Sequence, residues 1–270
     1  MIEHLLLPLV CERFKNESKY REGHLRVINA LPARRVIGVH SPEIKLLAKQ
    51  LSHKGCKIIM PDGTHKVCVN GAEIIRAFET VPDSNLSYEE TIIWGLLINL
   101  EKCPIGERLA MLGKYVPTLD NWAVCDSYCA HAKWIARADK HLIWNHLQQW
   151  YNSNKEFEVR FAIVISMCYF IDKEYLGEVF MRLDSINLEY IKSKYKSIKG
   201  KPTMAQQGTV SGAAPYYVRM GIAWFLATAL AKYPAETKEF IHSSHLPDDV
   251  IKLYIRKARE SFRTRNIDAT

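Results

Sequence analysis

The sequence predicts an all-α protein, built either as a bundle or as a solenoid of stacked antiparallel helix pairs. Apolar residues recur at helical spacing along most of the 270 residues, and short connections separate the segments that show this spacing. Helix start signals support the pattern, because Pro104, Pro234 and Pro247 stand where a first turn is expected. No strict sequence period links the pairs, so the solenoid prediction rests on the succession of helices.

Each expected helix carries an amphipathic or a continuously apolar pattern. The expected helices are 87–101, 104–115, 121–137, 139–151, 156–170, 172–185, 216–232, 235–244 and 247–264. Asp120, Asn154 and Asp172 are candidate N-caps because their side-chain oxygens can accept a first-turn N–H. We expect the pairs to span 121–151, 156–185 and 216–244, with the last helix as a polar cap.

Two segments interrupt the helical pattern, and we expect a single domain over residues 1–270 with insertions at about 54–71 and 187–215. The first contains two short apolar runs around Pro61-Asp62-Gly63, which predicts a β-hairpin near 56–69. The second is rich in lysine before residue 202 and in small residues from Gln206 to Ala214, which predicts a loop. Its lysines either follow a phosphate backbone or are solvated surface residues.

The charge balance favours a polyanionic partner such as nucleic acid. Lys and Arg number 37 against 29 Asp and Glu, which gives a formal net charge of +8. Seven cysteines, with no Cys-x-x-Cys pair, are typical of a reducing cytoplasm. The first nine residues lack the basic start of a signal peptide and the length of a membrane span, so we expect a cytoplasmic location and no membrane partner.

An aromatic residue and a carboxylate are expected on one helical face at Trp122 and Asp126. Residues four apart on a helix lie one above the other, so both side chains would address the same target, and this pairing suits a cationic ligand. The alternative is that Trp122 packs between helices and that Asp126 caps a helix or pairs with Lys133 or Arg160. We assign the tryptophans outside this pattern, Trp94, Trp134, Trp144 and Trp150, to packing.

Basic residues recur along the last expected helix at spacings of four, three and four. They are Lys252, Arg256, Arg259 and Arg263. One interpretation is a stripe that lies along a DNA strand, and the other is the solvated face of a terminal helix.

The sequence contains no complete metal or cofactor motif. Cys125, Cys129 and His131 lack a fourth ligand for zinc, and neither a nucleophile elbow nor a glycine-rich phosphate loop is present. We therefore expect no metal and no cofactor.

Several motifs, in order, resemble those of the AlkD-like DNA alkylation repair proteins. The first runs from Tyr20-Arg-Glu-Gly-His24 through Val36-Ile-Gly-Val-His-Ser-Pro42, and the later ones are Asn121-Trp-x-x-x-Asp126, Glu158-Val-Arg-x-Ala162, Tyr216-Tyr-Val-Arg-Met220 with Ala223-Trp224, and Arg259-Glu-Ser-x-Arg263. Together they cover most of the chain outside the two insertions. His40 and Lys45 stand where many relatives carry arginine, which weakens the expected phosphate contacts there.

The resemblance implies a superhelix of HEAT-like helix pairs whose concave basic face holds duplex DNA. Active members of that family excise N3- and N7-alkylated purines without drawing the base into a deep pocket, unlike base-flipping glycosylases. Matched position by position, the catalytic candidates are Trp122, Asp126, Arg160 and Trp224. Tyr20 is a weaker match, and we count it among the expected DNA contacts. We expect a monomer.

The chemistry of the lesion suggests a role for each candidate. A purine alkylated at N3 or N7 is cationic and leaves readily. The enzyme therefore has mainly to stabilise the positive charge that develops on the deoxyribose, and Asp126 can do this and orient a water. Trp122 and Trp224 can flank a cationic base. Arg160, with Arg219 as the second candidate, can hold a phosphate.

Three hypotheses follow. The first is a DNA glycosylase that acts on alkylpurine lesions in duplex DNA. The second is a non-catalytic DNA-binding scaffold of the same fold, and the third is a helical-repeat module for a protein partner.

Overall fold

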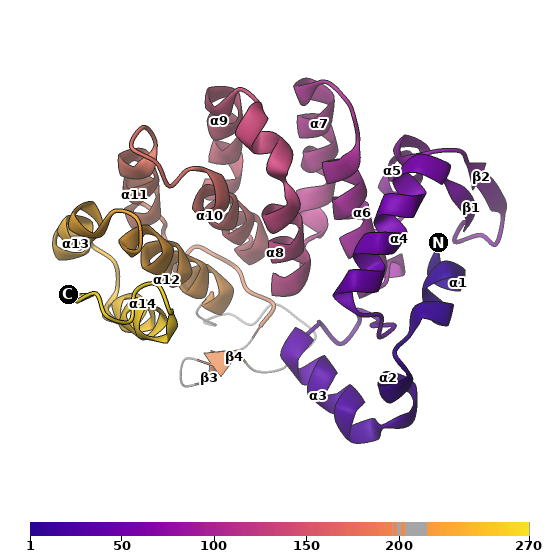
Figure 1. Cartoon of the computed structure of the whole chain (residues 1–270), viewed down its shortest axis with the longest axis horizontal. Coiled ribbons are helices and arrows are strands. Elements are labelled where there is room, and N and C mark those ends of the chain that lie inside the picture. The colour runs from indigo at the N-terminus through magenta and orange to yellow at the C-terminus, as the bar shows by residue number, and fades with distance from the viewer. Residues whose placement is uncertain (196, 199–200, 203–214, 270) are drawn as a thin grey trace. The chain divides into compact units, whose positions relative to one another are not determined.

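The computed structural model describes residues 1–195, 197–198, 201–202 and 215–269, and α-helices dominate this part of the chain (Figure 1). The prediction of an all-α helical-repeat protein with a small hairpin is confirmed. The chain forms two compact units, one over Met1–Ala138 and the other over the described residues from Asp139 onward, and each is described by itself. That the chain is one domain stays a prediction.

The first unit is a row of helices in which α4 packs on α6 and α6 packs on α8. α5 and α7 also pack on α6. The elements of this unit are α1 (Glu3–Leu6), η1 (Leu7–Leu9), α2 (Glu12–Asn16), α3 (Ser18–Ile28), α4 (Ser41–Lys54), β1 (Cys56–Ile59), β2 (His65–Cys68), α5 (Gly71–Glu79), η2 (Asp83–Asn85), α6 (Tyr88–Leu100), α7 (Ile105–Tyr115), η3 (Val116–Thr118), α8 (Trp122–His131) and η4 (Lys133–Arg137).

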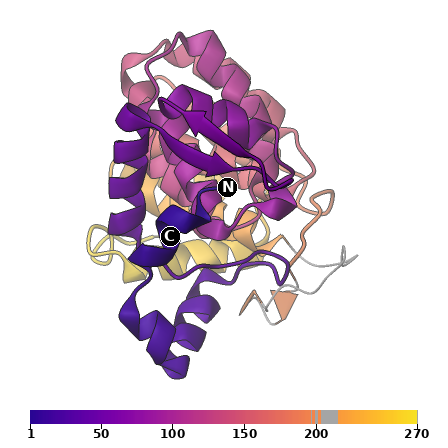
Figure 2. The ribbon, with the colours of Figure 1, turned by 90° about the vertical axis from the view of Figure 1, so that its right-hand side faces the viewer.

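The predicted hairpin is formed by β1 and β2, which pair antiparallel with Ile59 opposite His65. Asp62 accepts the backbone N–H of Thr64 at 2.9 Å, and Gly63 takes a φ of 82°, a conformation that favours glycine. The hairpin faces the viewer in Figure 2, where the start of the chain lies just below it, and the Ile59 N–H donates to the Met1 carbonyl at 3.0 Å.

The centre of the first unit is α6, which is buried along nearly its whole length. Its side chain Glu89 is fully buried and accepts the backbone N–H groups of Ile37, Gly38 and Val39 at 2.9, 2.7 and 3.2 Å. Gly38 has a φ of 101°, and an added Cβ would lie 2.2 Å from the Phe14 ring. The Ile37-Gly38-Val39 turn before α4 is therefore held by the Glu89 carboxylate of α6 and requires glycine at its centre.

The second unit repeats the row plan, because α10 packs on α9 and α12, and α12 packs on α13 and α14. Its elements are α9 (Lys140–Tyr151), α10 (Glu156–Tyr169), α11 (Leu176–Asp184), β3 (Ser197–Ile198), β4 (Lys201–Pro202), α12 (Tyr216–Leu230), α13 (Pro234–Ser243) and α14 (Asp248–Glu260). β3 and β4 form a short antiparallel pair inside the segment for which we expected only a loop. The residues Gln206 to Ala214 of that segment lie outside the described residues.

Several helix boundaries differ from the prediction. The expected helix 121–137 ends at His131, because Ala132 takes a ψ of 44° that no helix continues, and the 3₁₀ helix η4 follows. The expected helix 172–185 begins only at Leu176, and the expected helix 247–264 ends at Glu260.

The predicted N-caps Asp120, Asn154 and Asp172 were wrong, because α8, α10 and α11 have their N-caps at Asn121, Lys155 and Tyr175. The carboxylate of Asp120 is taken by Arg34, at 2.8 Å, so Asn121 caps α8 instead. The N-cap position of α10 is Lys155 rather than Asn154, and no side chain caps this helix. Asp172 does accept the N–H groups of Glu174 and Tyr175, each at 3.1 Å, but this turn precedes α11. Ion pairing thus outcompeted capping at Asp120.

Of the four tryptophans assigned to packing, Trp94, Trp144 and Trp150 are buried. Trp134 is half-buried and lies 4.8 Å from the Arg108 guanidinium. No helix in the described part of the chain is both long and apolar enough to cross a membrane.

Candidate functional site

The first turn of α8 is tied to the C-terminal end of α3. Asn121 is fully buried, accepts the Ala123 N–H at 2.8 Å, and donates its side-chain amide to the Ile28 carbonyl at 2.8 Å. The Trp122 indole N–H donates to the neighbouring Val27 carbonyl at 3.2 Å. A buried cap and an indole hydrogen bond therefore fix where the Trp122 ring lies.

Trp122 and Asp126 lie one turn apart on α8, and both side chains are partly exposed. Their neighbours Val124, Cys125, Tyr128 and Cys129 are buried, so the packed side of α8 is formed by other residues. An aromatic ring and a carboxylate thus share the part of this helix that a ligand can reach.

Tyr20 lies on α3 and is held by residues from two other segments. Its hydroxyl is 2.9 Å from Nε2 of His40, which N-caps α4, and the Arg13 guanidinium of α2 stacks over its ring at 4.4 Å. His24, one turn along α3, completes the cluster, and burial together with His40 lowers the pKa of its imidazole. Sequence reasoning noted His40 only as the loss of an arginine, whereas here it positions Tyr20.

Arg160, the expected phosphate contact, lies in the interior of the second unit. Its side chain is 3% exposed, and its guanidinium donates to the Tyr217 carbonyl at 2.7 Å. The reason is that α10 is buried on every face from Glu156 to Ser166. The prediction that Arg160 holds a phosphate stays untested, but the geometry gives this residue a role in holding α12.

Glu156, one turn before Arg160, was not singled out from the sequence. It is 2% exposed, accepts the Tyr217 N–H at 2.7 Å and accepts a hydrogen bond from the Ser193 hydroxyl. Burial raises its pKa to about 7, although the Ser193 and Tyr217 hydrogen bonds and the Arg160 charge favour the ionised form. This carboxyl anchors the start of α12, the helix that carries Trp224.

Arg219, the second candidate for a phosphate contact, forms an ion pair with Asp249 in the first turn of α14. The Arg219 side chain is 18% exposed and that of Asp249 is 56% exposed. A phosphate at Arg219 would therefore have to compete with a carboxylate that is already in place.

Trp224 lies on α12 at the edge of a pocket of about 520 Å³. The indole is 37% exposed. The pocket is formed between α12 and the end of α14, and its lining residues are Trp224, Ala227, Thr228, Ala231, Lys257, Glu260, Ser261, Phe262 and Arg263.

The predicted basic stripe is only partly a helical face. Lys252, Arg256 and Arg259 are exposed on α14, opposite the buried side chains of Val250, Tyr254 and Ala258. The expectation that Arg263 continues the stripe on the same helix was wrong, because α14 ends at Glu260 and Arg263 lies in the turn that follows. Arg256 also has a partner, since its Nε lies 3.6 Å from Glu260 Oε1.

Lysines of the basic insertion are only partly described. Lys192 and Lys194 are exposed, and the Lys192 backbone pairs with Asn154 and Glu156 at 2.7 and 3.3 Å. Lys196 and Lys199 lie outside the described residues. The start of this insertion is thus tied to the first turn of α10.

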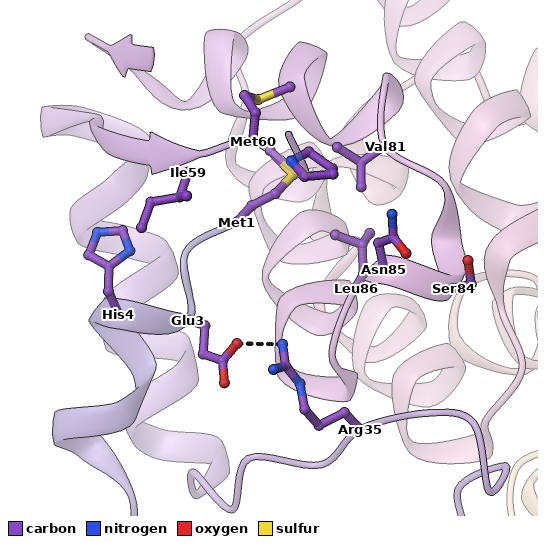
Figure 3. A pocket seen from close by; sticks show the side chains of 11 residues that line it. Met1, Glu3, His4, Arg35, Ile59, Met60, Val81, Ser84, Asn85 and Leu86 are labelled. Carbon is purple, nitrogen blue, oxygen red and sulfur yellow. Dashed lines mark ion pairs between the residues drawn. The ribbon is translucent and has the colours of Figure 1, made fainter. Parts of the chain in front are cut away.

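A further pocket, of about 470 Å³, lies between α1, the hairpin turn and η2 of the first unit (Figure 3). The Glu3 and Arg35 side chains on its wall are paired at 2.5 Å. None of the predicted site residues lines it.

Within the described residues, no group of three or more His, Cys, Asp and Glu side chains is arranged to hold a metal ion. Cys125 and Cys129 are buried in the core beside Tyr115 rather than presented to a ligand. The candidate residues thus form two groups, Tyr20, Trp122 and Asp126 in the first unit, and Arg160, Arg219, Trp224 and the α14 cations in the second.

The chain matches a known protein family over most of its length. The sequence profile described as DNA alkylation repair enzyme matches residues 22–262. No curated protein and no solved structure is significantly similar to the chain.

Proposed function

Because the chain belongs to the DNA alkylation repair enzyme family, whose role is DNA repair, we propose that it is a DNA glycosylase. Its substrate is duplex DNA that carries a cationic N3- or N7-alkylated purine, and the reaction is hydrolysis of the N-glycosidic bond. The observation that carries the proposal is the pairing of Trp122 with Asp126 on the accessible part of α8, with the first turn of that helix fixed by buried hydrogen bonds.

The leaving group explains why so few catalytic groups are needed. An alkylated purine already carries a positive charge, so the base departs as a neutral molecule and needs no general acid. Positive charge then develops on the deoxyribose, and a carboxylate at Asp126 stabilises it and orients the attacking water. Trp122 lies one turn away and offers its ring to the cationic base, an interaction of about 0.5–2 kcal/mol depending on desolvation.

The remaining candidates act by binding DNA. Trp224 offers a partly exposed aromatic surface, and Lys252, Arg256 and Arg259 offer exposed cations on α14. Such cations bind phosphates by charge and fix the register of the duplex. Tyr20, held by His40, is the corresponding contact in the first unit. No cofactor is required by this scheme.

The test is release of free base from methylated duplex DNA by the wild-type protein and by Asp126→Asn, with duplex binding measured on the same samples. We expect the wild type to release base and the variant to lose most of the release while it binds DNA almost as tightly. Unchanged release by Asp126→Asn would rule out this mechanism.

A non-catalytic DNA-binding scaffold is the second candidate. The observation in its favour is the burial of Arg160, since one of the four matched catalytic positions is used inside the fold. This function predicts salt-sensitive duplex binding without base release by either protein. Neither binding nor release would instead favour a protein partner.

A further inference from the structure

Phe262 is the most exposed large hydrophobic side chain in the described part of the chain, at 82%. It is the second residue after the end of α14 and lines the same pocket as Trp224. An aromatic side chain that is left in water on the wall of a pocket with a second, partly exposed aromatic residue indicates a binding surface rather than a packing residue.

The turn that carries Phe262 is firmly anchored. Thr264 is fully buried, and its hydroxyl donates to the Ala258 carbonyl at 2.7 Å. The backbone N–H groups of Thr264 and Arg265 donate to the Ser261 carbonyl at 3.1 and 2.9 Å. Phe262 is therefore presented by a hydrogen-bonded turn, which lowers the entropic cost of using its ring for binding.

The rim of this pocket is cationic. Lys257 and Arg263 line it, and the Arg265 guanidinium lies 5.5 Å from the centre of the Phe262 ring. The acidic lining residue Glu260 is already paired with Lys257 at 2.9 Å. Two aromatic side chains with cations around them match a ligand that combines a flat aromatic ring with negative charge, and a nucleotide has this combination.

We propose that Phe262 and Trp224 form a stacking site for one undamaged nucleobase that is turned out of the bound duplex, with Arg263 at a neighbouring phosphate. This site rests on the proposed DNA-directed function and extends it to the turn after α14. The occupant is a nucleotide within a strand, since the exposed cations of α14 continue along the helix from the pocket to Lys252 and can follow a backbone.

The test compares Phe262→Ala and Phe262→Trp with the wild type in binding to a duplex that carries a methylated purine. Alanine should weaken binding about 5- to 160-fold, the range that alanine substitution of a stacking aromatic produces, whereas tryptophan should retain it. Met181→Ala is the matched control, because Met181 is 65% exposed on α11 of the same unit, away from the pocket, and it should bind like the wild type.

A spectroscopic readout separates stacking from general apolar contact. A fluorescent purine analogue, 2-aminopurine, is placed at successive positions of the duplex, and its emission is followed on binding. At one position the wild type and Phe262→Trp should change the emission, and Phe262→Ala should not. No position with this behaviour would overturn the stacking site.

Failure of the site and failure of the function give different results. If the wild type binds methylated DNA or releases base from it and Phe262→Ala does so equally well, the stacking site is wrong and the repair function stands. If the wild type neither binds methylated DNA nor releases base, the repair function itself fails, and the site with it. Competition by free deoxynucleoside monophosphate at the concentration of the duplex would contradict the assignment of a strand as the occupant.

Discussion

Each unit contains a buried glutamate in the first turn of its central helix, and the two carboxyls are used differently. Glu89 of α6 accepts three backbone N–H groups from the turn that ends at His40. Glu156 of α10 accepts the backbone N–H groups of Tyr217 and Val218 and the hydroxyl of Ser193, and the charge of Arg160 also favours its ionised form. In both cases a buried carboxyl holds the segment that positions candidate site residues.

The difference explains the burial of Arg160. Three backbone N–H groups oppose the cost of burying Glu89, and its pKa is raised because burial still outweighs them. Glu156 has fewer such donors, and the charge of Arg160 favours its ionised form. Arg160 thus lowers the pKa of the Glu156 carboxyl by its charge and donates to the Tyr217 carbonyl of α12. An arginine that the motif suggests for a phosphate is in this chain part of the support for Trp224.

The largest effect on stability is expected at Glu89. Replacing it by alanine leaves three buried N–H groups without an acceptor, so the free energy of unfolding should fall by about 3–5 kcal/mol. Urea unfolding measures this change. Glu107, exposed in the first turn of α7, is the control, and its alanine variant should change stability by less than about 0.5 kcal/mol. A loss below about 1 kcal/mol for Glu89→Ala would show that the turn is held by other contacts.

Glu156 should make stability depend on pH near neutrality. Its pKa is raised from 4.5 to about 7 in the folded protein, so the folded state binds more protons than the unfolded state between these values. The free energy of unfolding should therefore fall as pH rises from about 4.5 to 7, by about 3 kcal/mol from this group.

The variant Glu156→Gln isolates that contribution, because glutamine does not titrate. Its unfolding free energy, measured in urea at several pH values, should fall less steeply than that of the wild type between pH 5 and 7.5. Equal slopes for the two proteins would contradict the assignment of a raised pKa to Glu156.

A substitution at Arg160 distinguishes its two possible roles, support of α12 inside the fold and contact with a DNA phosphate. Replacing it by methionine, which keeps the apolar stem, should cost about 2–3 kcal/mol because it leaves Glu156 and the Tyr217 carbonyl without this partner. If Arg160 acts only as support, the slope of log binding constant against log salt stays unchanged. If it contacts a phosphate, the slope should decrease by about 0.9. Lys252→Met is the comparison, since an exposed cation on α14 should lower the slope.

The sequence predicts the fold because apolar residues recur at helical spacing wherever a helix has one buried face and one face exposed to solvent. It also predicts the hairpin, since Pro61-Asp62-Gly63 has the residues that a tight turn needs. It fails at α10, where Arg160 looks like a surface arginine but every face of the helix is covered. The unbroken apolar run Phe161–Ile165 does indicate a buried helix, but the burial of Arg160 itself depends on the helices that pack around α10.

The candidate site shows the same limit. Spacing alone places Trp122 and Asp126 on one side of α8, because that relation is local to one helix. The partner of Tyr20 could not be read in this way, since His40 lies 20 residues away across a turn whose shape depends on Glu89. Phe262 was missed because the expected helix continued past Glu260, so the exposed turn that presents it was not foreseen.

The smallest predicted effect concerns the Tyr20 hydroxyl, which depends on the Glu89 turn through His40. Tyr20→Phe removes one partly buried hydrogen bond and should lower the free energy of unfolding by about 0.5–1.5 kcal/mol. The variant keeps the ring beneath Arg13. A loss of DNA-binding free energy larger than about 1.5 kcal/mol would therefore show that the hydroxyl itself contacts DNA. His40→Gln distinguishes the two roles, because its amide can still bond Tyr20. If His40→Gln binds DNA like the wild type, His40 acts by positioning Tyr20. If its DNA binding falls as in Tyr20→Phe, the imidazole contributes on its own.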